Sequence, residues 1–247
     1  MNDYIDMQEG GRTMPIHTSF NPNGRQELKH GITYMDYMLL RNKLRHVMKL
    51  DPNAGRDGRY LIRSCYFDNF ENKVLNEKKE GFLNRDKYRV RIYGKSSTVV
   101  NLERKSKRNN LTFKSKCKMT AREFERMRVG DIDWMEQDER ELMRDLFHEM
   151  KHHGLKPTTV VDYEREAYIY LYGNVRVTFD SKVKSSLRNT DMFNKNLPMV
   201  DVLEPSEVIL EVKYDEYLPD MIKMMLQGIN TKQEACSKYQ LSRMYGI

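Results

Sequence analysis

The sequence lacks any apolar run as long as a membrane helix needs, which is about 20 residues. The longest comparable stretch lies near Ala167–Tyr172. A signal peptide, with a basic region followed by an apolar one, is also missing, because Asp3, Asp6 and Glu9 stand among the first residues. These absences predict a cytoplasmic protein that does not itself span a membrane.

Cysteine is scarce, and so are the patterns that cysteine usually forms. The three cysteines, Cys65, Cys117 and Cys236, are widely spaced and include no CxxC pair. This argues against a disulfide framework or a zinc ribbon and fits a reducing cytosol, with each thiol a small core residue. The sequence also has no GxxxxGKS or GxxxxGKT motif, so a P-loop is excluded as the means of holding a nucleotide.

Positive charge is abundant and unevenly placed. The 247 residues carry a formal net charge of +7, and 39% of them are hydrophobic, enough for a core and against global disorder. Between Asn84 and Arg128 stand 15 Lys or Arg and 4 Asp or Glu, a local balance of +11, so the rest of the chain sums to −4. Such a concentration predicts an anionic partner: nucleic acid, an acidic membrane or a phosphate ligand.

The periodicity predicts one α+β domain at residues 25–247, with a mainly antiparallel sheet, after a flexible tail at residues 1–24. Strands are expected at Gln26–Ile32, Tyr60–Asp68, Lys87–Tyr93, Val99–Lys107, Leu111–Met119, Thr159–Tyr172, Asn174–Asp180 and Glu207–Tyr214. Helices are expected at Tyr34–Met48, Trp134–His153, Pro219–Ile229 and Ser237–Tyr245, with a helix or a wide connection at Asn69–Lys79. Thr120 and Glu123 have the spacing of a capping box, and Gly154 ends the preceding helix.

Charged residues alternate along these strands, and residues i and i+2 of a strand share a face. Arg89 and Arg91 share one face, while Val90 and Ile92 share the other. The charged positions found in this way are Glu27, Lys29, Arg63, Arg89, Arg91, Glu103, Lys105, Lys107, Lys114, Lys116, Lys118, Arg165, Arg176, Asp180, Glu211 and Lys213.

This basic face has two interpretations. An antiparallel sheet often turns a polar side to water, so any one strand fits a solvated surface. Like charges opposite each other are destabilising, however, and a solvated face would interleave Glu with Lys. A sheet closed into a barrel with its charges inward would bind a linear chain of phosphates at reduced dielectric and would be too narrow for duplex nucleic acid. We favour the second interpretation.

The few acids among these cations are candidates for a metal site. Phosphoryl transfer commonly uses a divalent cation held by carboxylate oxygens and substrate phosphates. Glu211, Glu27, Glu103 and Asp180 could serve, and each could instead pair with a neighbouring Lys or Arg. We favour the metal for Glu211 and leave Glu103 open.

Two further features invite a functional interpretation. His148, Glu149 and His152 form an HExxH pattern, but they lie opposite the apolar positions of the predicted helix, so we expect a solvated helix end and no zinc peptidase. Tyr88, Tyr93 and Phe113 stand beside basic residues and could stack on bases or pack against the outer core. Their alternation leaves both alternatives open.

A series of motifs follows one another along most of the chain. They are RQELKH at Arg25–His30, IRSCYFD at Ile62–Asp68, YRVRIYG at Tyr88–Gly94, LERKSK at Leu102–Lys107, FKSK at Phe113–Lys116, YEREAY at Tyr163–Tyr168, VRVTFD at Val175–Asp180, ILEVKY at Ile209–Tyr214 and SKY at Ser237–Tyr239. In this order they resemble the vacuolar transporter chaperone (VTC) domain, a polyphosphate polymerase branch of the triphosphate tunnel metalloenzymes.

The resemblance implies an antiparallel β-barrel tunnel of about eight strands, surrounding helices and a divalent metal, Mn²⁺ or Mg²⁺. It implies that ATP is the substrate, donating its terminal phosphoryl group to a growing polyphosphate chain. The residues implied to hold the phosphates are Lys29, Arg89, Arg91, Lys105, Lys116, Arg165, Arg176 and Lys238, with Glu211 on the metal. Arg25, Arg63, Lys107, Lys114, Lys213 and Ser237 are further phosphate-binding candidates.

One departure from the wider superfamily bears on the reaction. Its hydrolytic branch carries ExExK in the first strand, whereas this chain has Arg25, Glu27 and Lys29 there. The cation in place of the first Glu removes a metal ligand and adds a phosphate contact, so two-metal hydrolysis becomes less favoured.

A polyphosphate polymerase is therefore the first hypothesis. A triphosphatase of the same fold and a non-catalytic polyphosphate-binding module are the alternatives. ATP and polyphosphate are the expected ligands, with no nucleic acid. Localisation is expected to be cytoplasmic, and a membrane-protein partner that would hold the chain at the inner face of the membrane is left open, as is the oligomeric state.

Overall fold

Eight long antiparallel strands dominate the computed structural model, which describes residues 19–20, 24–109, 111–229 and 237–244. They are β2 (Gln26–Thr33), β4 (Arg59–Asp68), β5 (Arg85–Tyr93), β6 (Val100–Arg108), β7 (Leu111–Met119), β8 (Lys156–Tyr170), β9 (Val175–Ser185) and β11 (Glu207–Tyr214). Their order in the sheet is β7-β6-β5-β4-β8-β9-β11-β2. Three short strands, β1 (Ser19–Phe20), β3 (Lys49–Leu50) and β10 (Val200–Asp201), pair with β7, β8 and β9.

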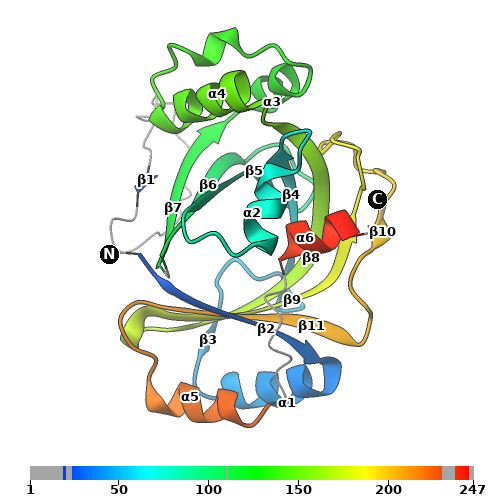
Figure 1. Ribbon diagram of the computed structural model, residues 1–247. Coiled ribbons are helices and arrows are strands. Elements are labelled where there is room, and N and C mark those ends of the chain that lie inside the picture. The colour runs from blue at the N-terminus through cyan, green and yellow to red at the C-terminus, as the bar shows by residue number, and fades with distance from the viewer. Residues whose placement is uncertain (1–18, 21–23, 110, 230–236, 245–247) are drawn as a thin grey trace, which may run out of the picture.

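The sheet curls strongly, so that its first and last long strands approach each other (Figure 1). In the described part of the chain, β2 and β7 are joined by a single bridge, in which the backbone N–H groups of Arg25 and Thr112 donate to each other's carbonyls at 3.1 and 3.2 Å. The predicted α+β class with a curled antiparallel sheet is confirmed. The sheet is therefore a strongly curled half-barrel whose two edges meet at this one bridge.

The apolar residues of the strands point outward, where helices cover them. Helices α1 (Tyr34–Leu44) and α5 (Asp220–Gln227) lie side by side against β9 and β11 (Figure 1). Their core contains Leu40, Leu44, Val177, Leu210 and Ile222, all buried. The hydrophobic effect therefore holds the sheet from outside, which leaves the inner face to polar side chains.

A second apolar core lies under α3 (Ala121–Arg128) and α4 (Glu141–His153). The capping box at the start of α3 is present, since Thr120 accepts from the backbone of Glu123 and donates its own N–H to the Glu123 carboxylate. Helix α4 begins later than predicted, because a separate 3-10 turn (η1, Asp133–Met135) precedes it and the Asp138 carboxylate accepts from the backbone N–H of Arg140 at 2.9 Å.

Two short helices, α2 (Lys73–Lys79) and α6 (Lys238–Met244), lie near one end of the curled sheet (Figure 1). Tyr239 of α6 is buried and its hydroxyl donates to the Asp68 carboxylate at the end of β4. None of the described helices is long and apolar enough to cross a bilayer.

Most of the predicted tail at residues 1–24 lies outside the described residues, apart from Ser19–Phe20 and Gly24. Cys65 and Cys117 are buried free thiols, whereas Cys236 lies outside the described residues.

Candidate functional site

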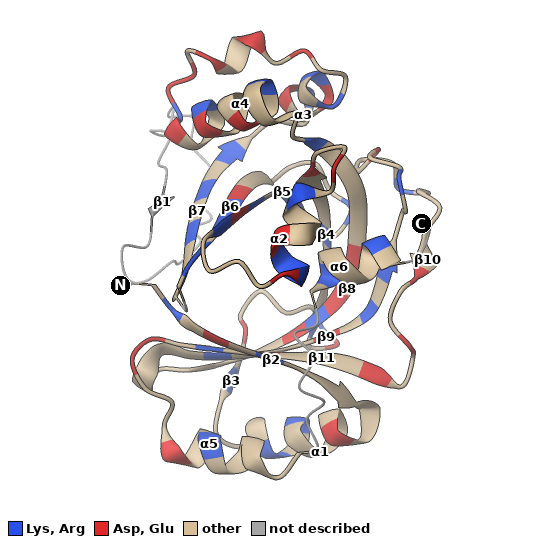
Figure 2. Ribbon diagram, viewed as in Figure 1, with Lys and Arg blue, Asp and Glu red and all other residues tan. Residues whose placement is uncertain are grey.

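The inner face of the curled sheet is here called the tunnel face. Lys and Arg residues occur along the strands of this sheet and in α6 (Figure 2). The alternation of each strand and the cross-strand register assign these cations to it: Lys29, Lys87, Arg89, Arg91, Lys105, Lys107, Lys114, Lys116, Arg165, Arg176 and Lys213. Lys238 of α6 joins them through its ion pair with Asp180. Glu27, Glu103, Asp180 and Glu211 share the same face. Segments far apart in the sequence therefore converge on one cationic interior.

Glu103 is the carboxylate at the centre of the β5-β6-β7 wall. It is 2% exposed, and Arg89 Nη2 lies 2.7 Å, Lys114 Nζ 2.7 Å and Arg91 Nη1 3.5 Å from its oxygens. Burial alone would raise the pKa of Glu103, but these three cations outweigh it and hold the pKa well below its usual range. Glu103 thus fixes the positions of cations that would otherwise repel one another.

Asp180 has the same role on the β8-β9 wall. Arg165 donates to both of its oxygens, at 2.6 and 2.8 Å, and Lys238 Nζ from α6 lies 2.5 Å away. Burial opposes ionisation, yet the charges of Arg165 and Lys238 lower the pKa of Asp180 to about 2. The ring of Tyr163 adds a cation–π contact to each cation, at 4.6 Å from Lys238 Nζ and 5.4 Å from the Arg165 guanidinium.

Glu27 and Glu211 form a carboxylate pair on the third wall. In the register of β2 and β11, Glu211 lies opposite Lys29 and Lys213 lies opposite Glu27, so the two acids are diagonal neighbours. Lys29 Nζ lies 2.9 Å from Glu27 and 3.6 Å from Glu211, and Lys213 Nζ lies 3.1 Å from Glu211. Lys105, from the opposite wall, pairs with the second oxygen of Glu27.

This carboxylate pair fits a Mg²⁺ or Mn²⁺ ion, which typically takes one or two carboxylates and completes its shell with water and substrate phosphates. Glu27 Oε1 is buried and accepts no well-aligned hydrogen bond from the described residues, although Lys29 Nζ lies 2.9 Å from it as an ion pair. No cluster of three Asp, Glu, His or Cys that could hold a metal ion is found among those residues. Cations lie against the oxygens of Glu103 and Asp180, as they do against those of Glu27 and Glu211, so all four carboxylates remain candidate ligands.

Lys87 is a tunnel cation that the sequence analysis missed. Its ammonium donates to Ser237 Oγ at 3.3 Å and lies 5.2 Å from the centre of the Tyr239 ring, and no carboxylate among the described residues pairs with it. Burial, followed by the charges of Lys29 and Lys105, lowers the pKa of Lys87 well below its usual range. The alternation of the strand could have identified Lys87, because Lys87 lies two residues before Arg89 and shares its face.

At the other end of β5 the tunnel face becomes aromatic. Tyr60 of β4 and Tyr93 of β5 have ring centroids 6.2 Å apart. Arg176 donates to the Tyr60 hydroxyl at 3.0 Å and pairs with the buried carboxylate of Asp51. Asp51 was not predicted either, since it follows no strand alternation and lies in the loop before β4.

The structure corrects the placement of Arg63. Its guanidinium, 1% exposed, donates to both oxygens of Asp162 at 2.8 Å and to the backbone carbonyls of Met192 and Asn194. Ser64 and Tyr66, its neighbours of opposite parity, contact Arg91 and Arg89. Arg63 therefore lies on the outer side of β4, and its guanidinium does not point into the tunnel.

The remaining predicted positions lie at the rims of the tunnel face. Lys107 and Lys116 pair with no carboxylate among the described residues, although Lys116 is the strand partner of Glu103. Arg25 pairs with Asp215 at 2.9 Å beside the seam between β2 and β7. Ser237 accepts from Lys87 just before α6.

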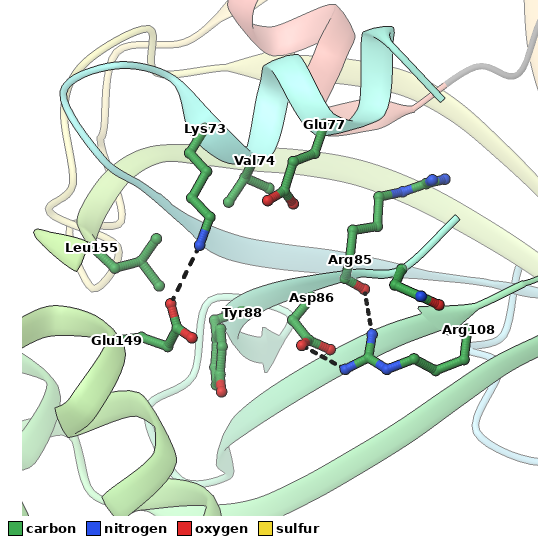
Figure 3. A pocket seen from close by; sticks show the side chains of 10 residues that line it. Lys73, Val74, Glu77, Arg85, Asp86, Tyr88, Arg108, Glu149 and Leu155 are labelled. Atoms are coloured by element: carbon green, nitrogen blue, oxygen red, sulfur yellow. Dashed lines mark hydrogen bonds and ion pairs between the residues drawn. The ribbon is translucent and has the colours of Figure 1, made fainter. Parts of the chain in front are cut away.

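A separate cavity of about 330 Å³ lies outside the tunnel, between α2, β5 and α4 (Figure 3). Its charges compensate one another: Arg108 pairs with Asp86 at 2.7 Å, and Lys73 lies 3.9 Å from Glu149. His148 of the HExxH pattern is exposed on α4 and stacks on His152 at 5.9 Å. These features differ from the tunnel face, where cations are in excess.

Comparison with known proteins assigns the fold and the family. The sequence model of the VTC domain family matches residues 24–245. The chain belongs to the VTC family.

Solved structures similar to this VTC chain include HpAC1 from Hippeastrum, described as a candidate adenylyl cyclase with a dominant triphosphatase activity. Its TM-score is 0.53 at 11% identity, over 89% of this chain and 95% of that one. A candidate adenylate cyclase from Bacillus halodurans has a TM-score of 0.46 at 13% identity, over 83% and 88% of the two chains. At 11% identity, the likeness to HpAC1 shows the triphosphate tunnel fold alone. No curated protein matches the chain.

Proposed function

We propose that this VTC chain is a polyphosphate polymerase that transfers the terminal phosphoryl group of ATP to the end of a polyphosphate chain in the tunnel. The observation that carries the proposal is the excess of cations over carboxylates on one curled face. Cations packed this closely repel one another, and an anion with many charges in a row relieves the repulsion at every step along the tunnel.

The reaction asks the protein mainly for positioning and charge stabilisation. Arg89 and Arg91 from one wall and Arg165 from another would align the donor phosphates, with Lys29 and Lys105 between them. Glu211 and Glu27 would hold the divalent metal, which would neutralise charge on the donor phosphates. Because the carboxylates fix the cations before the ligand arrives, little reorganisation is needed when charge develops in the transition state.

The test is incubation of purified protein with ATP and Mn²⁺ or Mg²⁺, followed by gel analysis for long phosphate chains. The wild type should form chains and release ADP. The Glu211→Gln variant should lose chain formation while it still binds inorganic triphosphate, because the cations remain. If the wild type yields orthophosphate and no chains, the protein is a triphosphatase of the same fold. Binding of polyphosphate without turnover under every metal and acceptor tried identifies a binding module.

A further inference from the structure

The tyrosines of the tunnel face differ in how much of their rings is free. Tyr66 and Tyr163 are 3% and 1% exposed, and their rings pack against Arg89 and against Arg165 and Lys238. Tyr93 is 46% exposed, and Tyr60 is the one aromatic ring that contacts it among the described residues. A planar ligand therefore finds a free ring face at Tyr93 and not deeper in the tunnel.

Tyr93 continues a row of phosphate-binding side chains. Arg89, Arg91 and Tyr93 occupy successive positions on the same face of β5, about 7 Å apart, given two residues of strand per step. In the register with β4, Arg91 lies opposite Ser64 and Tyr93 lies opposite Ile62, so the two side chains are neighbours on one face. A phosphate held at Arg91 would thus have an aromatic ring one step away.

Tyr60 links this ring to a third wall of the tunnel. Its hydroxyl accepts a hydrogen bond from Arg176, whose strand neighbour on β11 is Lys213. Cations from β5 and β9 therefore converge where the aromatic pair begins. Asn101 of β6 lies opposite Arg91 in the register and so shares its face. The side-chain amide of Asn101 makes no hydrogen bond within the described part of the chain.

We infer that Tyr93, supported by Tyr60, is the platform on which the base of the donor nucleotide stacks, so that ATP occupies the tyrosine end of the tunnel and the polyphosphate chain extends toward Lys87. This inference rests on the proposed function, because it takes ATP as the donor. Aromatic stacking is the usual way in which proteins hold a base without reading its edges, and it tolerates any base. Inorganic polyphosphate has no base, so Tyr93 distinguishes the donor from the acceptor.

The opposite end of β5 offers the competing platform. Phe82, 50% exposed, lies just before β5, and its carbonyl accepts from Arg85. Between the two ends stands Lys87, which has no carboxylate partner among the described residues and so suits a chain of phosphates better than a neutral base. Phe82 is therefore the matched control for Tyr93.

The experiment measures equilibrium binding by calorimetry in the absence of metal, with a nonhydrolysable ATP analogue and with inorganic triphosphate. Tyr93→Ala should weaken the analogue about tenfold, which is about 1.4 kcal/mol, and leave inorganic triphosphate unchanged. Tyr93→Phe should bind both as the wild type does, and so should Phe82→Ala. Because Tyr93 is half exposed, the alanine variant should remain folded.

Four results would overturn the inference. If the Tyr93→Ala variant binds the analogue as tightly as the wild type does, Tyr93 is not the base platform. The same holds if the variant loses both ligands alike. In either case polymerase activity can still be demonstrated, so the proposed function is not affected. Loss of analogue binding in Phe82→Ala places the base at the other end. A wild type that binds neither ligand refutes the platform and the proposed function together.

Discussion

Cations on the tunnel face fall into two groups at the scale of single residues. Arg89, Arg165 and most of their neighbours have a carboxylate within 4 Å, which holds them in place when no ligand is bound. Lys87 has none among the described residues. Lys87 is partly buried, and an ammonium in such a place without a counter-charge is costly to the folded chain unless an anion binds beside it.

Lys87→Met should weaken the binding of inorganic triphosphate about tenfold, because one charge-assisted contact is lost. The free energy of unfolding without ligand should stay the same or rise, since the variant removes repulsion with Lys29 and Lys105. Calorimetry and urea unfolding measure the two quantities, with Lys223→Met, an exposed change on α5, as the control. Lower stability with unchanged affinity would make Lys87 a structural residue.

Arg63 should show the reverse pattern, because it lies outside the tunnel in a buried pair. Arg63→Met leaves the Asp162 carboxylate without its partner and should cost about 3–5 kcal/mol in the free energy of unfolding. Triphosphate affinity of the folded protein should not change, as measured well below the melting temperature. A variant with normal stability and weakened affinity would return Arg63 to the site.

At the scale of elements, the capping box of α3 should affect the stability of the protein and not its binding of phosphates. Thr120→Ala removes the hydroxyl that accepts from the Glu123 backbone at 3.1 Å and should cost about 1 kcal/mol, whereas Thr120→Ser keeps the acceptor and should cost less. Urea unfolding measures both, and triphosphate binding should be equal in all three proteins. A change of affinity would mean that α3 influences the tunnel through the sheet beneath it.

The strands also show which features of the site can be predicted from the sequence. Alternation predicted the common face of Arg89 and Arg91 because a strand's period is local and does not depend on its neighbours. The same alternation gave the wrong face for Arg63. It divides the residues of a strand between two faces but does not say which face a distant segment will cover. Here residues 192–194 cover the outer face and offer backbone carbonyls to Arg63. Asp51 lies in a loop, where no period exists, and only the folded chain brings it to Arg176.

On the scale of the whole molecule, the cores lie outside the sheet and the charges inside it. Apolar packing against α1 and α5 on one side, and against α3 and α4 on the other, offsets the cost of an interior that is cationic. The folded chain without ligand is therefore strained electrostatically, and the strain depends on how many tunnel lysines are protonated.

This strain predicts a pH dependence of stability. Burial, with the charge of Lys29 added, lowers the pKa of Lys105 to about 7, and burial lowers the pKa of Lys114 to about 8, whereas an unfolded lysine titrates near 10.5. Between these values the unfolded chain binds more protons than the folded one, so the free energy of unfolding must rise with pH. From about pH 7 to about pH 8.5 the rise should be about 1 kcal/mol, after allowance for solvent screening of partly exposed lysines.

Above about pH 8.5 the buried thiols of Cys65 and Cys117 oppose the trend, because burial raises the pKa of each and the unfolded chain releases those protons first. Urea unfolding across the range tests the rise. Sulfate, which keeps its charge throughout, tests its origin: an anion favours the protonated lysines, so sulfate affinity must fall over the window in which stability grows. Stability that is flat from pH 7 to pH 8.5, or sulfate binding that strengthens there, would show that the tunnel lysines are fully charged and unstrained in the empty protein.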